Sequence, residues 1–332
     1  MKKTLIYGGG AMGSFLASCL YASDHKIFFL CRNDNYLACK KKGLTIKIYN
    51  NNILKKKILI KENKRFFFIN NIKKIKKTSF DYIFITTKIN SSLEKIFNKI
   101  EPFINSKTSL IPPCTAIPFW WYKCLNQKKH RLYEKKLSKN FLKNMKRKNI
   151  IGMTMWLSGK VEKPGLIKIN HIQRGYPLKE VFKKFKNKAD ILRGDIKKNC
   201  KSPSVKNIYS EIFSKSINSL AFNLIALKSG KNNFQLKKDK IERNNVYKIL
   251  SEGDEFLKKN EIKILQSANS RITQTLSSTT HTMSMLNAYR NNKEIEIQKL
   301  WRSFKSLINP LNFKMKTTEK IFRIVKKKLI KK

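Results

Sequence analysis

A polar stripe on an otherwise apolar helix is the arrangement in this sequence that is best suited to chemistry. Lys215, Ser219 and Asn223 are spaced four residues apart, so they share one side of a helix predicted over 208–229. The other sides carry isoleucine, leucine and phenylalanine, which should be buried, so the stripe should line a cleft. A lysine there can hold an anionic substrate and donate a proton to a carbonyl oxygen. The alternative is a solvent-exposed lysine without a catalytic role.

A glycine-rich segment near the N-terminus predicts a nucleotide site. Gly8, Gly10 and Gly13 form a G-x-G-x-x-G motif between an apolar strand and a helical pattern, and a second apolar strand follows at 26–31. Such glycines allow a tight turn, close approach of the backbone to a pyrophosphate, and close packing of helix on strand. The N-terminus of the helix would face the phosphates with unpaired N–H groups. A purely structural glycine turn is the alternative.

The end of the second strand indicates which dinucleotide would bind. An enzyme that uses NAD would place Asp or Glu there, against the ribose hydroxyls, whereas this strand is followed by Arg32. A guanidinium can meet a 2′-phosphate, so the sequence favours NADP(H) over an incidental surface arginine. Lys88, after another apolar strand at 81–86, is a second cation expected near the cofactor. The predicted cofactor-binding residues are Gly8, Gly10, Ala11, Met12, Gly13, Arg32 and Lys88.

The elements that must position these residues change character along the chain. Strand and helix patterns alternate first, which predicts a mostly parallel sheet with helices on both faces. Within this part, 44–60 predicts a hairpin, and the lysine-rich stretch 126–149 indicates a solvated loop or insertion. We therefore predict an α/β N-terminal Rossmann-type domain over 1–200, followed by an all-helical C-terminal domain over 206–332. In the second domain helices are expected over 208–229, 240–260, 266–290, 294–308 and from 317 onward.

The charge is unusual, because 73 Lys and Arg face 21 Asp and Glu, for a net charge of +52. Eleven of the 73 are arginine, which leaves 62 lysines, and these are spread along the chain among many Asn, Ile and Phe residues. This bias is typical of an AT-rich genome, and planar phosphate recognition would favour arginine. We therefore expect no specific nucleic-acid partner, although the potential should attract anionic ligands. The alternative is a basic protein that holds nucleic acid on a Rossmann scaffold.

Cysteine usage and the N-terminus indicate where the protein works. None of the six cysteines forms a C-x-x-C pair or has a histidine at metal-ligand spacing, which is typical of reduced thiols and predicts no metal site. Glycines at 8–10 interrupt the apolar run that a signal peptide would need, and no stretch is long enough to span a membrane. We expect a cytoplasmic protein without a membrane partner, whose helical domain could support a homodimer.

The order of the motifs along the chain resembles the ketopantoate reductase (2-dehydropantoate 2-reductase) family. The glycine motif, Arg32 and Lys88 are followed by the polar stripe with Glu211 before it, and then by Ser284 and Glu296. The segment 117–121, Ile-Pro-Phe-Trp-Trp, looks like a Pro-Trp-Trp variant of the family. The resemblance covers about 1–125 and 150–305, and the spacing of lysine, serine and glutamate in the second domain is its most specific part.

The resemblance implies reduction of the 2-oxo acid ketopantoate to (R)-pantoate with NADPH, a step toward pantothenate and coenzyme A. It implies that Lys215 is the general acid and that Glu296 orients Lys215 and the substrate hydroxyl. Thr115-Ala116 replaces the usual Asn-Gly, and Ser219 replaces the usual Asn, so another branched 2-oxo acid is an alternative substrate. The implied substrate-binding residues are Thr115, Ser219, Asn223 and Ser284.

Overall fold

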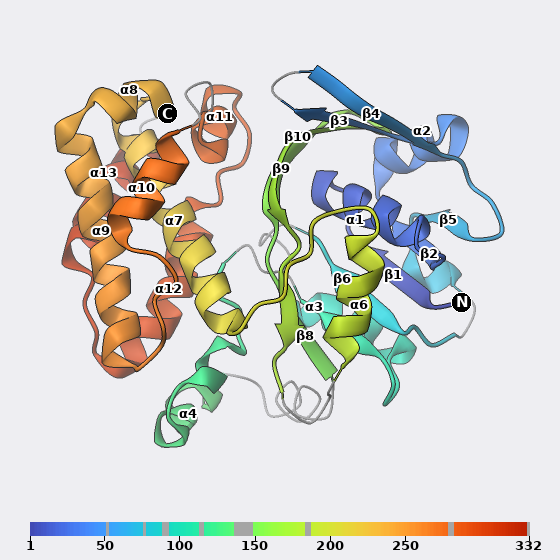
Figure 1. Ribbon diagram of the computed structural model, residues 1–332, viewed down its shortest axis with the longest axis horizontal. Coiled ribbons are helices and arrows are strands. Elements are labelled where there is room, and N and C mark those ends of the chain that lie inside the picture. The colour runs from blue at the N-terminus through green and yellow to red at the C-terminus, as the bar shows by residue number, and fades with distance from the viewer. Residues whose placement is uncertain are drawn as a thin grey trace. The chain divides into compact units, whose positions relative to one another are not determined.

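The computed structural model describes residues 1–50, 53–75, 78–87, 93–112, 116–135, 149–182, 187–277 and 282–330 (Figure 1). The chain divides into two compact units, Met1–Thr115 with Ser138–Ile208 and Ala116–Leu137 with Tyr209–Lys332. The first unit is built on β-sheets and the second is helical, so the predicted fold class is confirmed. The sequence-based boundary placed 116–135 in the first domain, whereas these residues fold with the helices.

A seven-stranded sheet forms the centre of the first unit. Its strands are β1 (Lys3–Tyr7), β2 (Lys26–Leu30), β5 (Phe66–Ile69), β6 (Tyr82–Ile85), β7 (Ser109–Ile111), β8 (Asn149–Met153) and β11 (Leu178–Glu180). They lie in the order β11-β8-β7-β6-β1-β2-β5, and only β11 is antiparallel to its neighbour. The chain adds β2 and β5 on one side of β1 and β6 to β8 on the other. The carboxyl ends of β1 and β6 are therefore the switch point at which such sheets bind ligands.

A second sheet covers helix α1 (Ala11–Tyr21) from the other side. Its strands β3 (Leu44–Asn50), β4 (Ile53–Ile60), β9 (Trp156–Lys163) and β10 (Leu166–Gly175) lie in the order β4-β3-β10-β9. Helix α1 contacts β1 and β2 as well as β3, β9 and β10, so it is packed between the two sheets (Figure 1). Because it is covered on both sides, all of residues 13–20 are buried. The hairpin β3–β4 was predicted, but its membership of a separate sheet was not.

Three further α-helices and two short 3-10 turns complete the described part of the first unit. The helices are α2 (Asn33–Lys42), α3 (Leu93–Ile100) and α6 (Lys188–Lys197), and the turns are Ile72–Lys74 and Glu101–Phe103. Helix α6 was not predicted, and it packs against α1 and β11 through the fully buried side chains of Leu192 and Ile196.

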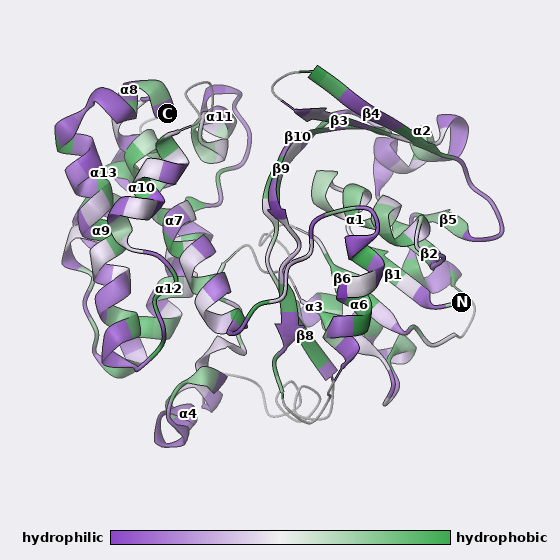
Figure 2. Ribbon diagram, viewed as in Figure 1, coloured by the Kyte–Doolittle hydropathy of each residue, from purple (hydrophilic) through white to green (hydrophobic). Residues whose placement is uncertain are grey.

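The second unit is assembled around one buried helix, α7 (Ile208–Ser229). Apolar side chains cover most of its circumference, as expected for a helix surrounded by others. A Cβ added at Gly253 of α9 (Lys240–Lys259) would lie 2.7 Å from Cγ1 of Ile217, so the glycine permits close packing of α9 on α7. Figure 2 shows hydrophilic and hydrophobic residues alternating along α9. The other α-helices described are α4 (Gln127–Glu134), α8 (Asn233–Lys238), α9 (Lys240–Lys259), α10 (Ala268–Leu276), α11 (Ser284–Arg290), α12 (Ile297–Ile308) and α13 (Lys316–Ile330).

Two sequence-based assignments need correction in this unit. Residues 127–134 of the expected loop or insertion form helix α4, because Asn126 caps its first turn and the Tyr133 hydroxyl donates to the Leu307 carbonyl over 2.7 Å. Residues 136–148 of that stretch lie outside the described residues. The single helix expected over 266–290 is replaced by α10 and α11. None of the helices described here has the length and apolarity that crossing a bilayer requires.

A buried histidine joins β1, β2 and α6 at the amino ends of the strands. The Nδ1 atom of His25 lies 2.8 Å from the Thr4 hydroxyl oxygen, and Nε2 lies 3.1 Å from Oδ2 of Asp195, which also pairs with Lys2. Burial lowers the pKa of His25 below its usual value, and the hydrogen bond and charge of Asp195 offset this only in part. The charges of Lys2 and Asp81 also reach the ring, with opposite effects on this pKa.

We expect this histidine to make the fold sensitive to acid. Its pKa is lower in the folded chain than the value of about 6.5 in the unfolded chain, so the unfolded chain binds more protons. The stability contributed by neutral His25 is thus present above about pH 6.5 and is lost as the pH falls below it. Melting curves from about pH 7.5 to about pH 5.5 should show a smaller loss of Tm in His25→Gln than in wild type. The exposed His171 provides the control, and equal slopes for His25→Gln, His171→Gln and wild type would contradict the assignment.

Candidate active site

The glycine turn joins β1 to α1 through contacts that admit no side chain. Gly8 has a φ of +134°, its N–H donates to the Leu30 carbonyl over 3.2 Å, and its carbonyl accepts from the Thr86 hydroxyl over 2.8 Å. A Cβ at Gly13 would lie 2.2 Å from the Gly8 oxygen and 2.4 Å from Oγ1 of Thr86. Close packing of α1 against the ends of β1 and β6 therefore requires glycine at both positions.

The surroundings of Gly10 are open, unlike those of Gly8 and Gly13. It precedes α1 in an extended conformation, with a φ of −76°, and no heavy atom lies within 4 Å of a Cβ added there. The first turn of α1, which begins with Ala11 and Met12, contains no acidic residue, and no side chain caps it. The first N–H groups of a helix have no acceptor within the helix, and they favour an anion. Open space beside such groups fits the pyrophosphate of a dinucleotide.

Arg32 lies next to this turn. It follows β2, its side chain is exposed, and it occupies the N-cap position of α2. Burial raises the pKa of Tyr7 at the end of β1, and the nearby charge of Arg32 lowers it in part, so the guanidinium acts on the carboxyl end of β1. A cation in this position fits a phosphate on the ribose. The other predicted cation, Lys88, lies outside the described residues.

Two residues that support the glycine turn, Asn35 and Thr86, were not identified by the sequence analysis. The side-chain amide of Asn35 donates to the Gly9 carbonyl and accepts from the Gly165 N–H, both over 2.8 Å. It thus fastens the glycine turn to the connection between β9 and β10. No local pattern identifies Asn35, because one partner lies 130 positions along the chain. Thr86 follows β6 at the switch point, where topology alone could have suggested it.

In the helical unit, the polar stripe on α7 is linked to the start of α11. Lys215 and Ser219 are half-buried, and Asn223 is only 3% exposed. The Asn223 amide donates to the Ser219 carbonyl over 2.8 Å, and its oxygen accepts from the Met285 N–H over 3.0 Å. Ser284, the first residue of α11, is therefore held beside the stripe. The structure thus joins Ser219 and Asn223 to the N-terminus of α11, where Ser284 is exposed, while Thr115 lies outside the described residues.

The two residues predicted to be catalytic, Lys215 and Glu296, also belong to this unit. Burial lowers the pKa of the Lys215 amine to about 8, which makes this group able to exchange protons near neutral pH. Glu296 is half-buried and stands immediately before α12, whose residues Ile297 and Leu300 are fully buried. Among the described residues, no group of three or more His, Cys, Asp or Glu side chains could hold a metal ion.

The tryptophan pair of the segment 117–121 belongs to the core of the helical unit. The indole N–H of Trp121 donates to the Tyr209 carbonyl over 2.9 Å, and its ring packs on Phe213 with centroids 5.5 Å apart. The Ile117 N–H also donates to Oγ of Ser303 over 3.2 Å. These contacts explain why the segment folds with the helices, and they make Trp121 a core anchor.

Gly13 and Gly10 permit a matched test of the turn, because only Gly13 is closely surrounded by other atoms. An alanine at Gly13 would force its methyl against the Gly8 carbonyl, and overpacking of this kind costs about 1–3 kcal/mol of unfolding free energy. An alanine at Gly10 meets no atom and should change the unfolding free energy by less than about 0.5 kcal/mol. Urea unfolding of both variants measures the difference. Equal losses in the two variants would show that the contact at Gly13 does not constrain the fold.

Comparison with known proteins is consistent with these features. Residues 4–112 match the family model for ketopantoate reductase PanE/ApbA. A search of curated protein sequences gives no match. The structure resembles 2-dehydropantoate 2-reductase from Methylococcus capsulatus, with 14% identity, coverage of 99% of this chain and 97% of that chain, and a TM-score of 0.75. It also resembles 2-dehydropantoate 2-reductase from Geobacter metallireducens GS-15, with 15% identity, coverage of 98% of this chain and 99% of that chain, and a TM-score of 0.74.

A second group of solved structures is equally similar in fold. A ternary complex of D-mandelate dehydrogenase with NADH and anilino(oxo)acetate shares 18% identity over 99% of this chain and 98% of that chain, with a TM-score of 0.74. At such identities the likeness establishes the fold, and the family model adds the sequence evidence. The resemblance predicted from the sequence is therefore confirmed: the chain has the fold of the ketopantoate reductases, and residues 4–112 carry the sequence signature of that family of oxidoreductases acting on 2-oxo acids.

Proposed function

We propose that this protein reduces a 2-oxo acid with NADPH, and that 2-dehydropantoate is its substrate and (R)-pantoate its product. The observation that carries the proposal is the half-buried Lys215, whose pKa is lowered to about 8 on the same side of α7 as Ser219 and Asn223. The family match over 4–112 and the geometry of the glycine turn support it from the other unit.

The first unit provides the residues for the cofactor. The open backbone at Gly10 and the N-terminus of α1 would hold the pyrophosphate. Arg32 would hold the 2′-phosphate, which is why we propose NADPH although the similar D-mandelate dehydrogenase was solved with NADH. Lys88 is proposed as a second cation for the cofactor. When bound, NADPH supplies the hydride, and the protein orients it and supplies the proton.

The second unit provides the groups that meet the substrate. The Lys215 ammonium donates its proton to the carbonyl oxygen as negative charge develops there, and Glu296 orients Lys215. The hydroxyl groups of Ser219 and Ser284 can donate hydrogen bonds to the substrate. The amide of Asn223 is engaged with Ser219 and with the N–H of Met285, so we assign it the positioning of both serines.

Another 2-oxo acid is the second candidate substrate. D-mandelate dehydrogenase has the same fold, and its ternary complex holds anilino(oxo)acetate. This chain has Ser219 and Thr115 where the ketopantoate reductases usually have asparagine, and these side chains reach less far. A roomier site would favour a substrate with a larger side chain. Turnover of a panel of branched and aromatic 2-oxo acids distinguishes the two candidates.

Substitution of Lys215 tests the reaction and the general acid together. We expect the wild-type protein to oxidise NADPH in preference to NADH when ketopantoate is present. Lys215→Ala should lower kcat/KM by about 10²–10⁴-fold, because the proton donor is lost, while the Kd for NADPH is unchanged. Lys228→Gln is the matched control, since Lys228 lies on the same helix but pairs with Glu242. Full turnover in Lys215→Ala would rule out this role.

Measurements on the wild-type protein test the substrate assignment and the cofactor assignment separately. Tight NADPH binding without turnover of ketopantoate would discard this substrate and keep the site, and the panel of other 2-oxo acids would then decide. Absence of NADPH binding would discard the cofactor assignment itself.

The lowered pKa of Lys215 predicts the pH dependence of the reduction. Only the ammonium form can donate a proton, so kcat/KM should be highest below the pKa and should fall as the pH rises through about 8. Lys215→Arg removes this titration because a guanidinium stays protonated. A pH–rate profile of kcat/KM measures the effect. A wild-type profile that stays flat through about pH 9 would mean that Lys215 is not the proton donor.

A further inference from the structure

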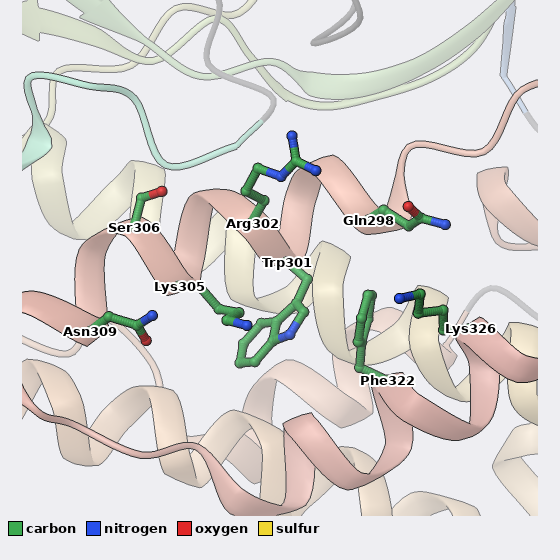
Figure 3. Close-up of a pocket in the computed structure, with 8 residues that line it drawn as sticks. All are labelled: Gln298, Trp301, Arg302, Lys305, Ser306, Asn309, Phe322 and Lys326. Atoms are coloured by element: carbon green, nitrogen blue, oxygen red, sulfur yellow. The ribbon is translucent and has the colours of Figure 1, made fainter. Parts of the chain in front are cut away.

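A pocket of about 370 Å³ lies on the helical unit, apart from the residues assigned to the reaction. It is formed by α12, α13 and the turn that follows α12, and Figure 3 shows its lining side chains. Its volume is in the range of small-molecule sites in proteins. The lining residues are Gln298, Trp301, Arg302, Lys305, Ser306, Asn309, Phe322 and Lys326.

Two aromatic rings form the apolar part of this pocket. The centroids of Trp301 and Phe322 are 6.0 Å apart, and their planes are inclined by 41°. Trp301 is held firmly, since only 4% of it is exposed, while Phe322 is half-buried. Trp301 therefore backs Phe322, whose partly exposed ring offers a preformed surface on which another planar ring can pack.

The polar part of the pocket is positive. Arg302, Lys305 and Lys326 line it, and no acidic residue does. Within the part of the chain that the structure describes, none of these three cations forms an ion pair, whereas the nearby Lys299 and Arg323 pair with glutamates. Figure 3 shows the amino groups of Lys305 and Lys326 extending toward the two rings. Uncompensated cations beside an apolar surface suit an anion that also carries a ring.

We propose that this pocket binds an aromatic phosphate of nucleotide size. Its ring packs against Phe322, which Trp301 backs, and its phosphate is held by Lys305 and Lys326, whose amino groups lie beside the rings in Figure 3. The side chains of Gln298, Ser306 and Asn309 offer amide and hydroxyl groups for the polar edge of the ring. The proposal rests on the helical unit alone, so it does not depend on the reaction proposed above.

A signal from Trp301 itself can test this binding. The chain has four tryptophans, so protein labelled with 5-fluorotryptophan gives four ¹⁹F resonances, and Trp301→Phe identifies the one from the pocket. AMP should shift this resonance, and the shift should reach a plateau at submillimolar AMP as the pocket fills. Adenosine and inorganic phosphate at the same concentration should shift it little, because each lacks one half of the recognised group. The local signal also separates this pocket from the glycine turn, where AMP could bind through its phosphate.

Paired substitutions test the contribution of the lining cations. Lys305→Gln with Lys326→Gln should weaken AMP binding by at least about tenfold, since two charge-assisted contacts are lost. Lys320→Gln with Lys327→Gln removes the same charge from α13 outside the pocket and should change the affinity less than about twofold. An unmoved Trp301 resonance, phosphate that binds as well as AMP, or equal losses in both double variants would each overturn the proposal.

Discussion

The approach of α1 to the ends of β1 and β6 is the constraint on which the first unit depends. The carbonyl of Gly8, the hydroxyl of Thr86 and the backbone of Gly13 occupy a space in which no Cβ fits at either glycine. This contact brings α1 close to the large sheet, and the second sheet then covers the other side of the helix. The same contact directs the N-terminus of α1 to the switch point. Packing and the proposed ligand binding thus have one geometric cause here.

The helical unit depends on burial in a different way. Helix α7 is apolar around most of its circumference, so the side chains on its polar stripe are partly withdrawn from water. Burial disfavours the charged form of an amine, and it is the cause of the lowered pKa of Lys215. The hydrogen bonds of Asn223 offset part of the cost of placing polar groups there. The unit therefore accepts a local loss of stability at the residues to which we assign the reaction.

The sequence predicted the local features well and the long-range ones poorly. The glycine motif, the strands β1, β2, β6 and β7 and the bounds of α7 could all be predicted, because each follows from a short pattern of residue types, whereas the short strands β5 and β11 were not predicted. The second sheet could not, since β3 and β10 are separated by more than a hundred residues and pair only in the folded chain. The same reason hides Asn35, whose two partners lie on different connections.

Prediction of the candidate site was limited in the same way, because local spacing could be read from the sequence and long-range contacts could not. Spacing on one helix identified Lys215, Ser219 and Asn223, but it could not show that the amide of Asn223 is occupied by the N–H of Met285. The position of 116–125 also could not be predicted from composition. It depends on the indole of Trp121 finding the Tyr209 carbonyl, 88 positions along the chain.

Burial also decides which of the 73 basic residues can act chemically. An exposed cation such as Arg32 keeps its hydration, attracts anions over a distance, and loses that attraction as salt rises. A half-buried amine such as Lys215 has given up part of its hydration, so it acts at short range and can release its proton near neutral pH. The abundance of lysine raises the concentration of anions around the whole surface. In our proposals specificity arises where packing fixes a cation beside a backbone turn, a polar stripe or a ring.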